Sequence, residues 1–320
     1  MINSIGDINN VKSIYIFKKI FNYILYDRTL KIIKYHKKSQ KKLDINRDNY
    51  KEYSKRFLPI EIEIIPIKGS SGKFFNVDNI KDLSYFHVFF DKDSKDKKRC
   101  YIKKNEKVSK IKLIIDYKII SFKFLFIDCK CIESIYFIKF YRNNIDNMEK
   151  MFYGCSSLKR INISNFNTDT VTNMRGMFSG CELLEELNLS NFNTKNVKTM
   201  GYMFNGCKSL KKLDLSNFNT NNVTDMESMF GRCDSLKELN LVNFNFNNVI
   251  CMKKMFYFCH FKELIIPISN LFSNKASRDL LLYNFPEKLR DEIMNQIRKD
   301  NILDGKDISD FEKEYANLKK

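Results

Sequence analysis

The sequence has little of several residue types, and each shortage narrows what the protein can do. The chain of 320 residues contains no tryptophan, 4 prolines, 10 glycines and 3 histidines. No phosphate-binding glycine loop and no pair of catalytic carboxylates stands out. The histidines are His36, His87 and His260. The histidines are few and do not recur at a regular interval, and only Cys129 and Cys131 are close enough in sequence to suggest a pair of metal ligands. We therefore expect no enzyme, no cofactor and no metal site.

Long apolar runs and a disulfide framework are also missing. The first apolar segment, residues 14–26, is interrupted by Lys18 and Lys19, is too short to span a bilayer and lacks a small-residue cleavage site. The cysteines number 9, an odd count, and most fall in one recurring column. We therefore expect an intracellular, cytoplasmic protein, with a cell-surface location as the alternative.

Positive charge is in excess, and it is concentrated in the first third of the chain. The formal net charge is +18, and residues 1–120 carry 28 Lys and Arg against 14 Asp and Glu. Residues 12–43 are predicted to form two basic helices. The second offers a weak anionic contact, to nucleic acid or a membrane surface, through Lys31, Lys34, Lys37, Lys38, Lys41 and Lys42.

A pattern of 26 residues recurs through the middle of the chain. Subtracting one period from the first clear copy brings Cys155 onto Cys129, so a degenerate first copy begins near Ile119. The last copy closes at Pro267. Methionine, phenylalanine and valine columns return with the cysteines, which are Cys129, Cys155, Cys181, Cys207, Cys233 and Cys259.

Each copy divides into two halves. The first, V-x-x-M-x-x-M-F-x-x-C, spaces its apolar residues by three or four, which predicts one face of a short helix. The second, L-x-x-L-x-L, ends in the alternation of a strand. The predicted helix-start residues are Thr168, Thr194 and Thr220. Stacked copies would place their strands in a parallel ladder about 4.8 Å apart.

The full consensus, L-x-x-L-x-L-S-N-F-N-T-x-x-V-x-x-M-x-x-M-F-x-x-C, resembles the BspA-type leucine-rich repeat of bacterial surface lipoproteins and protist proteins. The resemblance covers roughly residues 119–266. It implies a solenoid that binds other molecules, often proteins, and that has no catalytic residues. Many members of that family carry a signal peptide, which this sequence does not show.

The expected fold class is therefore an α/β solenoid, a leucine-rich-repeat-like stack of short parallel strands and short helices. We expect a basic helical segment over residues 1–50 and a small β-rich module over 51–118. The solenoid of about six repeats occupies 119–267, and C-terminal helices over 268–320 cap it.

The cysteine, methionine and asparagine columns each allow a functional interpretation besides a structural one. The cysteines could be metal ligands, disulfide partners or nucleophiles, but a buried column of small apolar residues fits them best. Methionine and phenylalanine at helical spacing indicate core rather than an adaptable groove. The asparagines are expected to satisfy backbone groups in turns. They are Asn165, Asn191, Asn217, Asn243, Asn167, Asn193, Asn219 and Asn245.

Outward positions of the predicted strands form the best candidate surface for a partner. They are Arg160, Asn162, Glu186, Asn188, Lys212, Asp214, Glu238 and Asn240. Four of them form a column that alternates in sign, and at ladder spacing its neighbours are expected to pair with one another. Such a mixed-charge surface suits a protein partner better than a nucleic-acid backbone.

The leading hypothesis is a non-enzymatic scaffold that binds proteins through this strand face. Three alternatives stay open. The pattern at residues 16–24 faintly resembles an F-box-like segment, which would imply a ubiquitin-ligase-type adaptor. The basic segment would make the chain a nucleic-acid or membrane binder. A BspA-type adhesin at the cell surface is the third.

Overall fold

The computed structural model describes residues 37–42, 47–77, 80–116 and 119–267, together with residues 291, 295 and 313. The chain divides into two compact units, residues 1–58 and 59–320. The first expected basic helix, the F-box-like segment and nearly all of the expected C-terminal helical cap lie outside the described residues. Among the described residues, no helix is long and apolar enough to cross a membrane.

The described part of the first unit holds two helices, α4 (Lys37–Lys42) and α5 (Arg47–Lys55). Asp48 lies in the first turn of α5 and Lys55 in its last turn, where their charges complement the helix dipole. In α4, Lys37 and Lys41 are exposed. Two of the other basic residues that we expected to act with them, Lys31 and Lys34, lie outside the described residues.

The second unit begins with a five-stranded sheet in the order β3-β5-β1-β6-β7. Its strands are β1 (Ile60–Pro66), β3 (Phe86–Phe90), β5 (Ile111–Ile115), β6 (Ile132–Lys139) and β7 (Arg160–Asn162). Smaller elements of this unit are β2 (Gly72–Lys73), η1 (Ile80–Tyr85) and β4 (Tyr101–Ile102). Strands β1, β3 and β5 alternate buried and half-buried residues, as their alternating sequences require.

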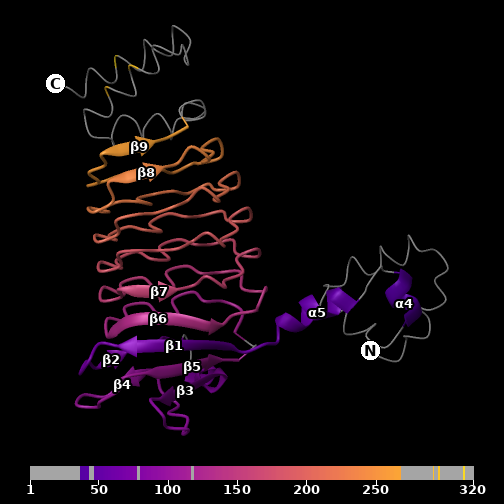
Figure 1. The fold of residues 1–320 in the computed structure, drawn as a ribbon. Coiled ribbons are helices and arrows are strands. Elements are labelled where there is room, and N and C mark those ends of the chain that lie inside the picture. The colour runs from indigo at the N-terminus through magenta and orange to yellow at the C-terminus, as the bar shows by residue number, and fades with distance from the viewer. Residues whose placement is uncertain are drawn as a thin grey trace. The chain divides into compact units, whose positions relative to one another are not determined.

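The β-rich module and the repeats share this sheet. Strand β1 pairs with β6 in antiparallel register, and β6, which belongs to the first repeat, pairs with β7 in parallel register. The following repeats continue the stack (Figure 1), up to the parallel pair β8 (Glu238–Asn240) and β9 (Glu263–Ile265). A second line of parallel bridges joins successive repeats through Asn147, Asn173, Thr199, Asp225 and Cys251. The module therefore covers the open edge of the first repeat.

The short helix predicted in each repeat is absent, and this prediction was wrong. Over the described repeats, residues 119–267, the structure contains strands, bridges and turns but no helix. Each repeat instead forms a ladder of turns. The N–H groups of Met174, Gly176, Phe178 and Gly180 donate to the next repeat, at 2.7–3.1 Å, and the N–H groups of residues 177, 179 and 181 donate back three positions. A six-residue helix would leave its first N–H groups without partners, whereas this ladder gives every second N–H a carbonyl of the next repeat.

The turn ladder requires positive φ at two positions in each repeat. The second of these positions holds Gly154, Gly180 and Gly206 at φ +70 to +75°, and glycine adopts this conformation without strain. The next two repeats place Arg232 and Phe258 there, at φ +57° and +56°. A side chain other than glycine costs about 1–2 kcal/mol in this region.

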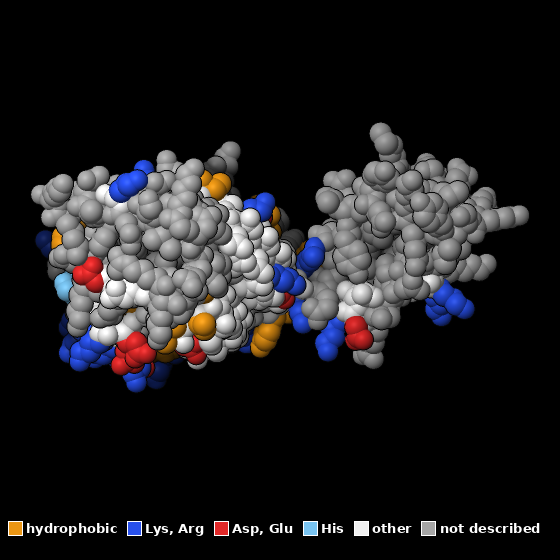
Figure 2. Space-filling view, turned by 90° about the horizontal axis from the view of Figure 1, so that it is seen from above, with side chains coloured by type: hydrophobic (Ala, Val, Ile, Leu, Met, Phe, Trp, Pro, Cys, Tyr) orange, Lys and Arg blue, Asp and Glu red, His pale blue; other side chains and the backbone are white. Residues whose placement is uncertain are grey.

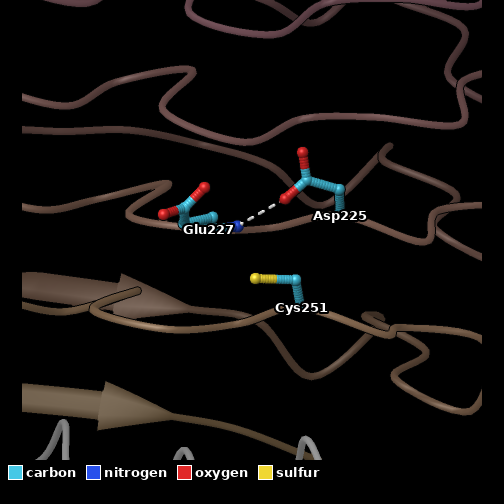
Figure 3. A group of neighbouring side chains, drawn as sticks. All are labelled: Asp225, Glu227 and Cys251. Carbon is cyan, nitrogen blue, oxygen red and sulfur yellow. Dashed lines mark hydrogen bonds between the residues drawn. The ribbon is translucent and has the colours of Figure 1, made fainter.

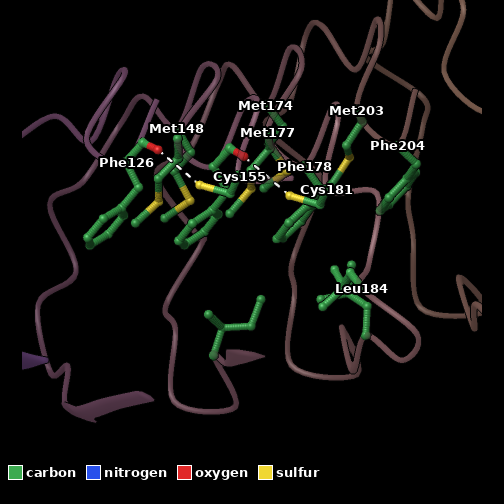
Figure 4. Packing of buried hydrophobic residues seen from close by; sticks show 14 of the residues in the cluster. Phe126, Met148, Cys155, Met174, Met177, Phe178, Cys181, Leu184, Met203 and Phe204 are labelled. Atoms are coloured by element: carbon green, nitrogen blue, oxygen red, sulfur yellow. Dashed lines mark hydrogen bonds between the residues drawn. The ribbon is translucent and has the colours of Figure 1, made fainter. Parts of the chain in front are cut away.

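The apolar columns form the core, which confirms that prediction. Phe126, Phe152, Phe178, Phe204, Phe230 and Phe256 stack in one file, with ring centroids 5.4–6.0 Å apart and planes within 15° of parallel. The methionine and cysteine columns line up beside this file (Figure 4), and all are buried. Offset stacking of aromatic rings at this separation adds to the stabilisation from burial.

The threonine column joins neighbouring repeats instead of starting helices. The Thr194 hydroxyl donates to the Asn219 carbonyl at 2.9 Å and accepts the Asn219 N–H at 2.8 Å. Thr168 and Thr220 bond to the next repeat in the same way. Our prediction for these residues was wrong because no helix is present for them to cap.

The asparagine columns satisfy turn backbone groups, as the sequence predicts. The side-chain amide of Asn217 donates to the carbonyls of Leu189 and Phe192 in the previous repeat, at 3.0 and 2.7 Å. Asn219, in the second column, accepts the N–H of Asn221 at 3.0 Å. These side chains therefore bind the repeats together rather than face a ligand.

One loop covers the outer edge of strand β3. The Asp96 carboxylate accepts the N–H of Val88 at 3.0 Å and also bonds to His87 and Lys98. The N–H of Lys97 donates to the Val88 carbonyl at 2.8 Å. Covering these groups removes the strand edge that would otherwise template association with another chain.

We expect Asp96→Asn to lower the free energy of unfolding by about 1–2 kcal/mol at neutral pH. Burial acts to raise the pKa of Asp96, but hydrogen bonds from Lys98, Val88 and His87 outweigh it and hold the pKa well below its ordinary value. The stability that this carboxylate contributes is therefore present above its unfolded pKa of about 4 and is lost as the pH falls below that value. Urea titrations of the wild type and of Asp96→Asn between pH 7 and pH 2 measure the difference in their free energies of unfolding. A difference that does not become smaller as the pH falls would contradict the assignment.

Candidate functional site

The eight residues predicted to face a partner are all exposed on one side of the repeats, which we call the strand face. The 26-residue period sets them in columns. Arg160 pairs with Ser134 of the preceding repeat in parallel register, and Glu186 forms a parallel bridge to Lys212. At the far end, Glu238 pairs with Glu263 and Asn240 with Ile265. The inward leucines of each L-x-x-L-x-L segment are buried and hold these side chains outward.

Two hollows lie on the strand face. One, of about 530 Å³, is lined by Lys212, Asp214, Glu238 and Asn240 over an apolar floor of leucines. The other, of about 500 Å³, lies toward the N-terminal end and is lined by Tyr136, Arg160 and Glu186 among others. The structure thus brings six of the eight predicted residues to the rims of two shallow depressions.

The alternating column of Arg160, Glu186, Lys212 and Glu238, which we call the charge column, does not neutralise itself. Within the described residues, none of these four side chains forms an ion pair, so our prediction of pairing between them was wrong. The pairs form in the neighbouring column instead: Lys159 with Glu133 at 3.1 Å, and Lys211 with Glu185 at 2.6 Å. That neighbouring hydrogen bond lowers the pKa of Glu185 and raises the pKa of Lys211.

Charged side chains of both signs lie next to one another along one edge of the unit that holds the repeats (Figure 2). Because none of its four side chains forms an ion pair within the described residues, the charge column leaves its charges available to an incoming surface. Surface ion pairs contribute at most about 1 kcal/mol each, so the fold loses little by leaving these four apart.

A second polar cluster, on the turn ladder, was missed by sequence reasoning. The Arg175 guanidinium passes over Gly201 and bonds to Asp225 and, at 3.0 Å, to Glu227, two repeats away. Any side chain at position 201 would collide with this bridge, because an added Cβ would lie 2.6 Å from the guanidinium. The sequence does contain a sign of this cluster. Arg175, Gly201 and Glu227 occupy the same position of three successive repeats, with the glycine between the arginine and the glutamate.

Tyr202 completes this cluster. Its hydroxyl donates to Glu227 at 2.6 Å, and the Arg175 guanidinium lies 4.7 Å from its ring centroid. The Tyr202 bond is the main cause that lowers the pKa of Glu227. Burial acts to lower the pKa of Arg175, but the bond to Glu227 and the charge of Asp225 outweigh it and raise that pKa.

Asp225, Glu227 and Cys251 offer three metal-ligand atoms within 4.8 Å of one another (Figure 3). Their oxygens are already engaged. Asp225 accepts bonds from Thr199 and from the Glu227 N–H, at 3.0 Å each, besides its pair with Arg175. The Arg175 guanidinium supplies the positive charge that a cation would bring to these carboxylates. The bonds of the cluster connect three successive repeats.

The cysteine column is buried and bonded to the backbone. Its last five members each donate S–H to the carbonyl of the phenylalanine 29 residues earlier, at 2.9–3.2 Å. Burial raises the pKa of Cys207 to about 12 and that of Cys259 to about 11. The thiolate that a nucleophile or metal ligand requires is therefore disfavoured in this column.

We expect a maleimide to label the native protein at Cys100 and Cys251, which are half-buried, and to leave the seven buried cysteines unmodified. All nine should react in 8 M urea, a concentration on the order of that used to unfold domains of this size. Peptide mass spectrometry after a short pulse identifies the labelled positions. Rapid native labelling of Cys181 or Cys207 would contradict the buried column.

Comparison with protein families finds a similarity over the repeats. A family model described as "Mycoplasma protein of unknown function, DUF285" matches residues 121–213 and 146–267. No curated protein matches significantly. A solved leucine-rich repeat protein from Bacteroides ovatus is similar at 18% identity, with a TM-score of 0.30. The match covers 52% of this chain and 44% of that protein, so the chain spans less than half of its length.

Proposed function

We propose that this chain is a non-enzymatic scaffold that binds protein partners through the strand face, with the repeats forming a solenoid of the BspA type. The charge column is the observation that supports it. Four exposed charges stand in line on hydrogen-bonded repeats, and within the described residues the fold uses none of them for its own ion pairs. The hydrogen-bonded repeats fix the spacing of the backbone that carries these side chains, so a partner does not have to order the backbone on binding.

The chemistry of the strand face suits a protein better than a polyanion. The sign of the charge column alternates, so a phosphate backbone would meet repulsion at Glu186 and Glu238 as well as attraction at the basic positions. The hollows have apolar floors and polar rims, which is the arrangement of a protein–protein interface.

We also propose that the protein works in a reducing, intracellular compartment. The described residues include nine free cysteines, two of them half-buried. Half-buried thiols oxidise more readily in secreted proteins than in the cytosol.

Proximity labelling in cells that naturally make the protein tests the compartment and the strand face together. A Lys212→Glu/Glu238→Lys exchange keeps the net charge and reverses the pattern, so we expect proteins labelled by the wild type to drop out of the labelled set. Lys198→Glu, an exposed change outside the strand face, serves as the control and should leave the set unchanged. An identical set of labelled proteins for the wild type and the exchange variant would overturn the proposal.

A further inference from the structure

The order of signs in the charge column singles out one partner. Along the stack, Arg160, Glu186, Lys212 and Glu238 read plus, minus, plus, minus. The 26-residue period sets one such residue on each successive repeat. A parallel bridge joins the middle two, Glu186 and Lys212, at strand spacing of about 4.8 Å, and Arg160 and Glu238 pair with the repeats beyond them. A complementary surface must present the opposite order at the same interval. A second copy of this stack presents that order when it faces the first copy with its repeats running in the opposite direction.

We propose that two copies of this chain pair face to face through the charge column, about a two-fold axis that runs along the strands between Glu186 and Lys212. This rotation reverses the order of the repeats and keeps each column opposite itself. Arg160 then faces Glu238 of the partner subunit, and Glu186 faces Lys212 of the partner subunit. Each pairing occurs twice, as an interface with two-fold symmetry requires.

The alternative two-fold axis in the plane of the strand face fails. An axis that runs along the stack would keep the repeats in order and would set each charge opposite its own copy, plus against plus and minus against minus. Like charges in contact oppose association strongly at an interface. The charge column therefore selects both the antiparallel, face-to-face arrangement of the two stacks and its register.

The next outward column agrees with this arrangement. Its members, two residues further along each strand, are Tyr136, Asn162, Asn188, Asp214, Asn240 and Ile265. Reversal sets Asn188 opposite Asp214 of the partner subunit, and Asn162 opposite Asn240 of the partner subunit. Tyr136, which lines one hollow, then meets Ile265 of the partner subunit, which lines the other hollow. Each contact is complementary in chemistry.

The column of existing ion pairs is also largely compatible. Reversal sets Glu185 opposite Lys211 of the partner subunit and Glu133 opposite Lys262 of the partner subunit. The exception places Lys159 opposite Lys237, and both ammonium groups are already directed elsewhere. Lys159 bonds to Glu133 at 3.1 Å, and Lys237 donates to the Asp234 carbonyl at 2.8 Å.

This inference rests on the proposed function, because it assigns a partner to the same strand face, and its test distinguishes the two. The full chain is studied by sedimentation velocity over a range of concentrations, at low and at high salt. We expect a monomer–dimer equilibrium in which salt weakens the dimer. Arg160→Glu alone and Glu238→Arg alone should each weaken self-association at least tenfold, on the order of a 1.4 kcal/mol loss, because each sets two like-charge pairs in the interface.

Mixing the two variants is the decisive arm. In the mixed dimer, the glutamate introduced at position 160 of one variant meets the arginine introduced at position 238 of the other. The unaltered Glu238 of the first variant meets the unaltered Arg160 of the second, so every pair is attractive again. We therefore expect two monomeric variants to form a dimer when they are combined, which misfolded proteins would not do. Lys198→Glu, studied in the same way, is the control and should dimerise like the wild type.

Three results would overturn the dimer. They are a wild type that stays monomeric at every concentration, a dimer indifferent to both charge reversals, and variants that fail to associate when mixed. A monomeric wild type whose labelled partners still depend on Lys212 and Glu238 would end this inference and leave the proposed function in place. A dimer without any dependence of labelled partners on these residues would limit the strand face to self-association.

Discussion

Phe178→Ala is expected to lower the free energy of unfolding by about 3–5 kcal/mol. The ring is fully buried and stacks between Phe152 and Phe204, with centroids 5.5 and 6.0 Å away. Removing it leaves a cavity in the middle of a continuous file, where the backbone ladder prevents the neighbouring repeats from collapsing into the space. Urea unfolding followed by circular dichroism measures the loss.

Leu183→Ala is the matched control in the same repeat. Leu183 is 45% exposed, and its truncation should change the free energy of unfolding by less than about 0.5 kcal/mol. A loss of less than about 1 kcal/mol in Phe178→Ala, on the order expected for an ordinary surface change, would mean that the aromatic file does not form as described.

Gly180→Ala is expected to destabilise the protein by about 2 kcal/mol. Gly180 adopts φ +75°, and an added Cβ would lie 3.3 Å from the Gly154 Cα in the repeat before it. Strain and contact therefore act in the same direction. The sign separates the turn ladder from the helix that the sequence predicts, because alanine would stabilise a helix by about 1 kcal/mol relative to glycine.

The opposite change at the equivalent position should have the opposite sign. Arg232 adopts φ +57°, and Arg232→Gly is expected to stabilise the protein by up to about 1 kcal/mol. The Arg232 side chain is exposed, and its guanidinium lies 5.8 Å from the Phe258 ring centroid, so its removal sacrifices little. Urea titrations of both variants provide the comparison, and a more stable Gly180→Ala protein would refute the ladder.

The sequence predicted the period, the buried columns and the exposed side of each strand because these depend on which residues recur. It did not predict the turn ladder. Spacings of three and four suit a helix, but they also arise when turns alternate with bonds to the next repeat. Distinguishing a helix from a turn ladder requires the sign of φ at Gly176 and Gly180, and glycine adopts negative and positive φ about equally well. Non-glycine residues at the equivalent positions, such as Tyr202 and Arg232, hid the requirement for positive φ.

The polar clusters were predictable in part. The strand face followed from alternation along each strand, but the absence of pairing in the charge column did not, because side chains with the same spacing pair one column away. The Arg175 bridge escaped notice for another reason. It joins residues 50 positions apart across Gly201, and a comparison of adjacent repeats does not look that far.

A charge column that is free for recognition should contribute almost nothing to the stability of the fold. The free energy of unfolding of a variant with alanine at all four of its positions measures this contribution, by comparison with the wild type at a concentration where both are monomeric. The positions are Arg160, Glu186, Lys212 and Glu238. We predict a difference below about 1 kcal/mol, since all four side chains are exposed and unpaired within the described residues. A loss of several kcal/mol would show that the column holds the repeats together, and its charges would then not be free for a partner.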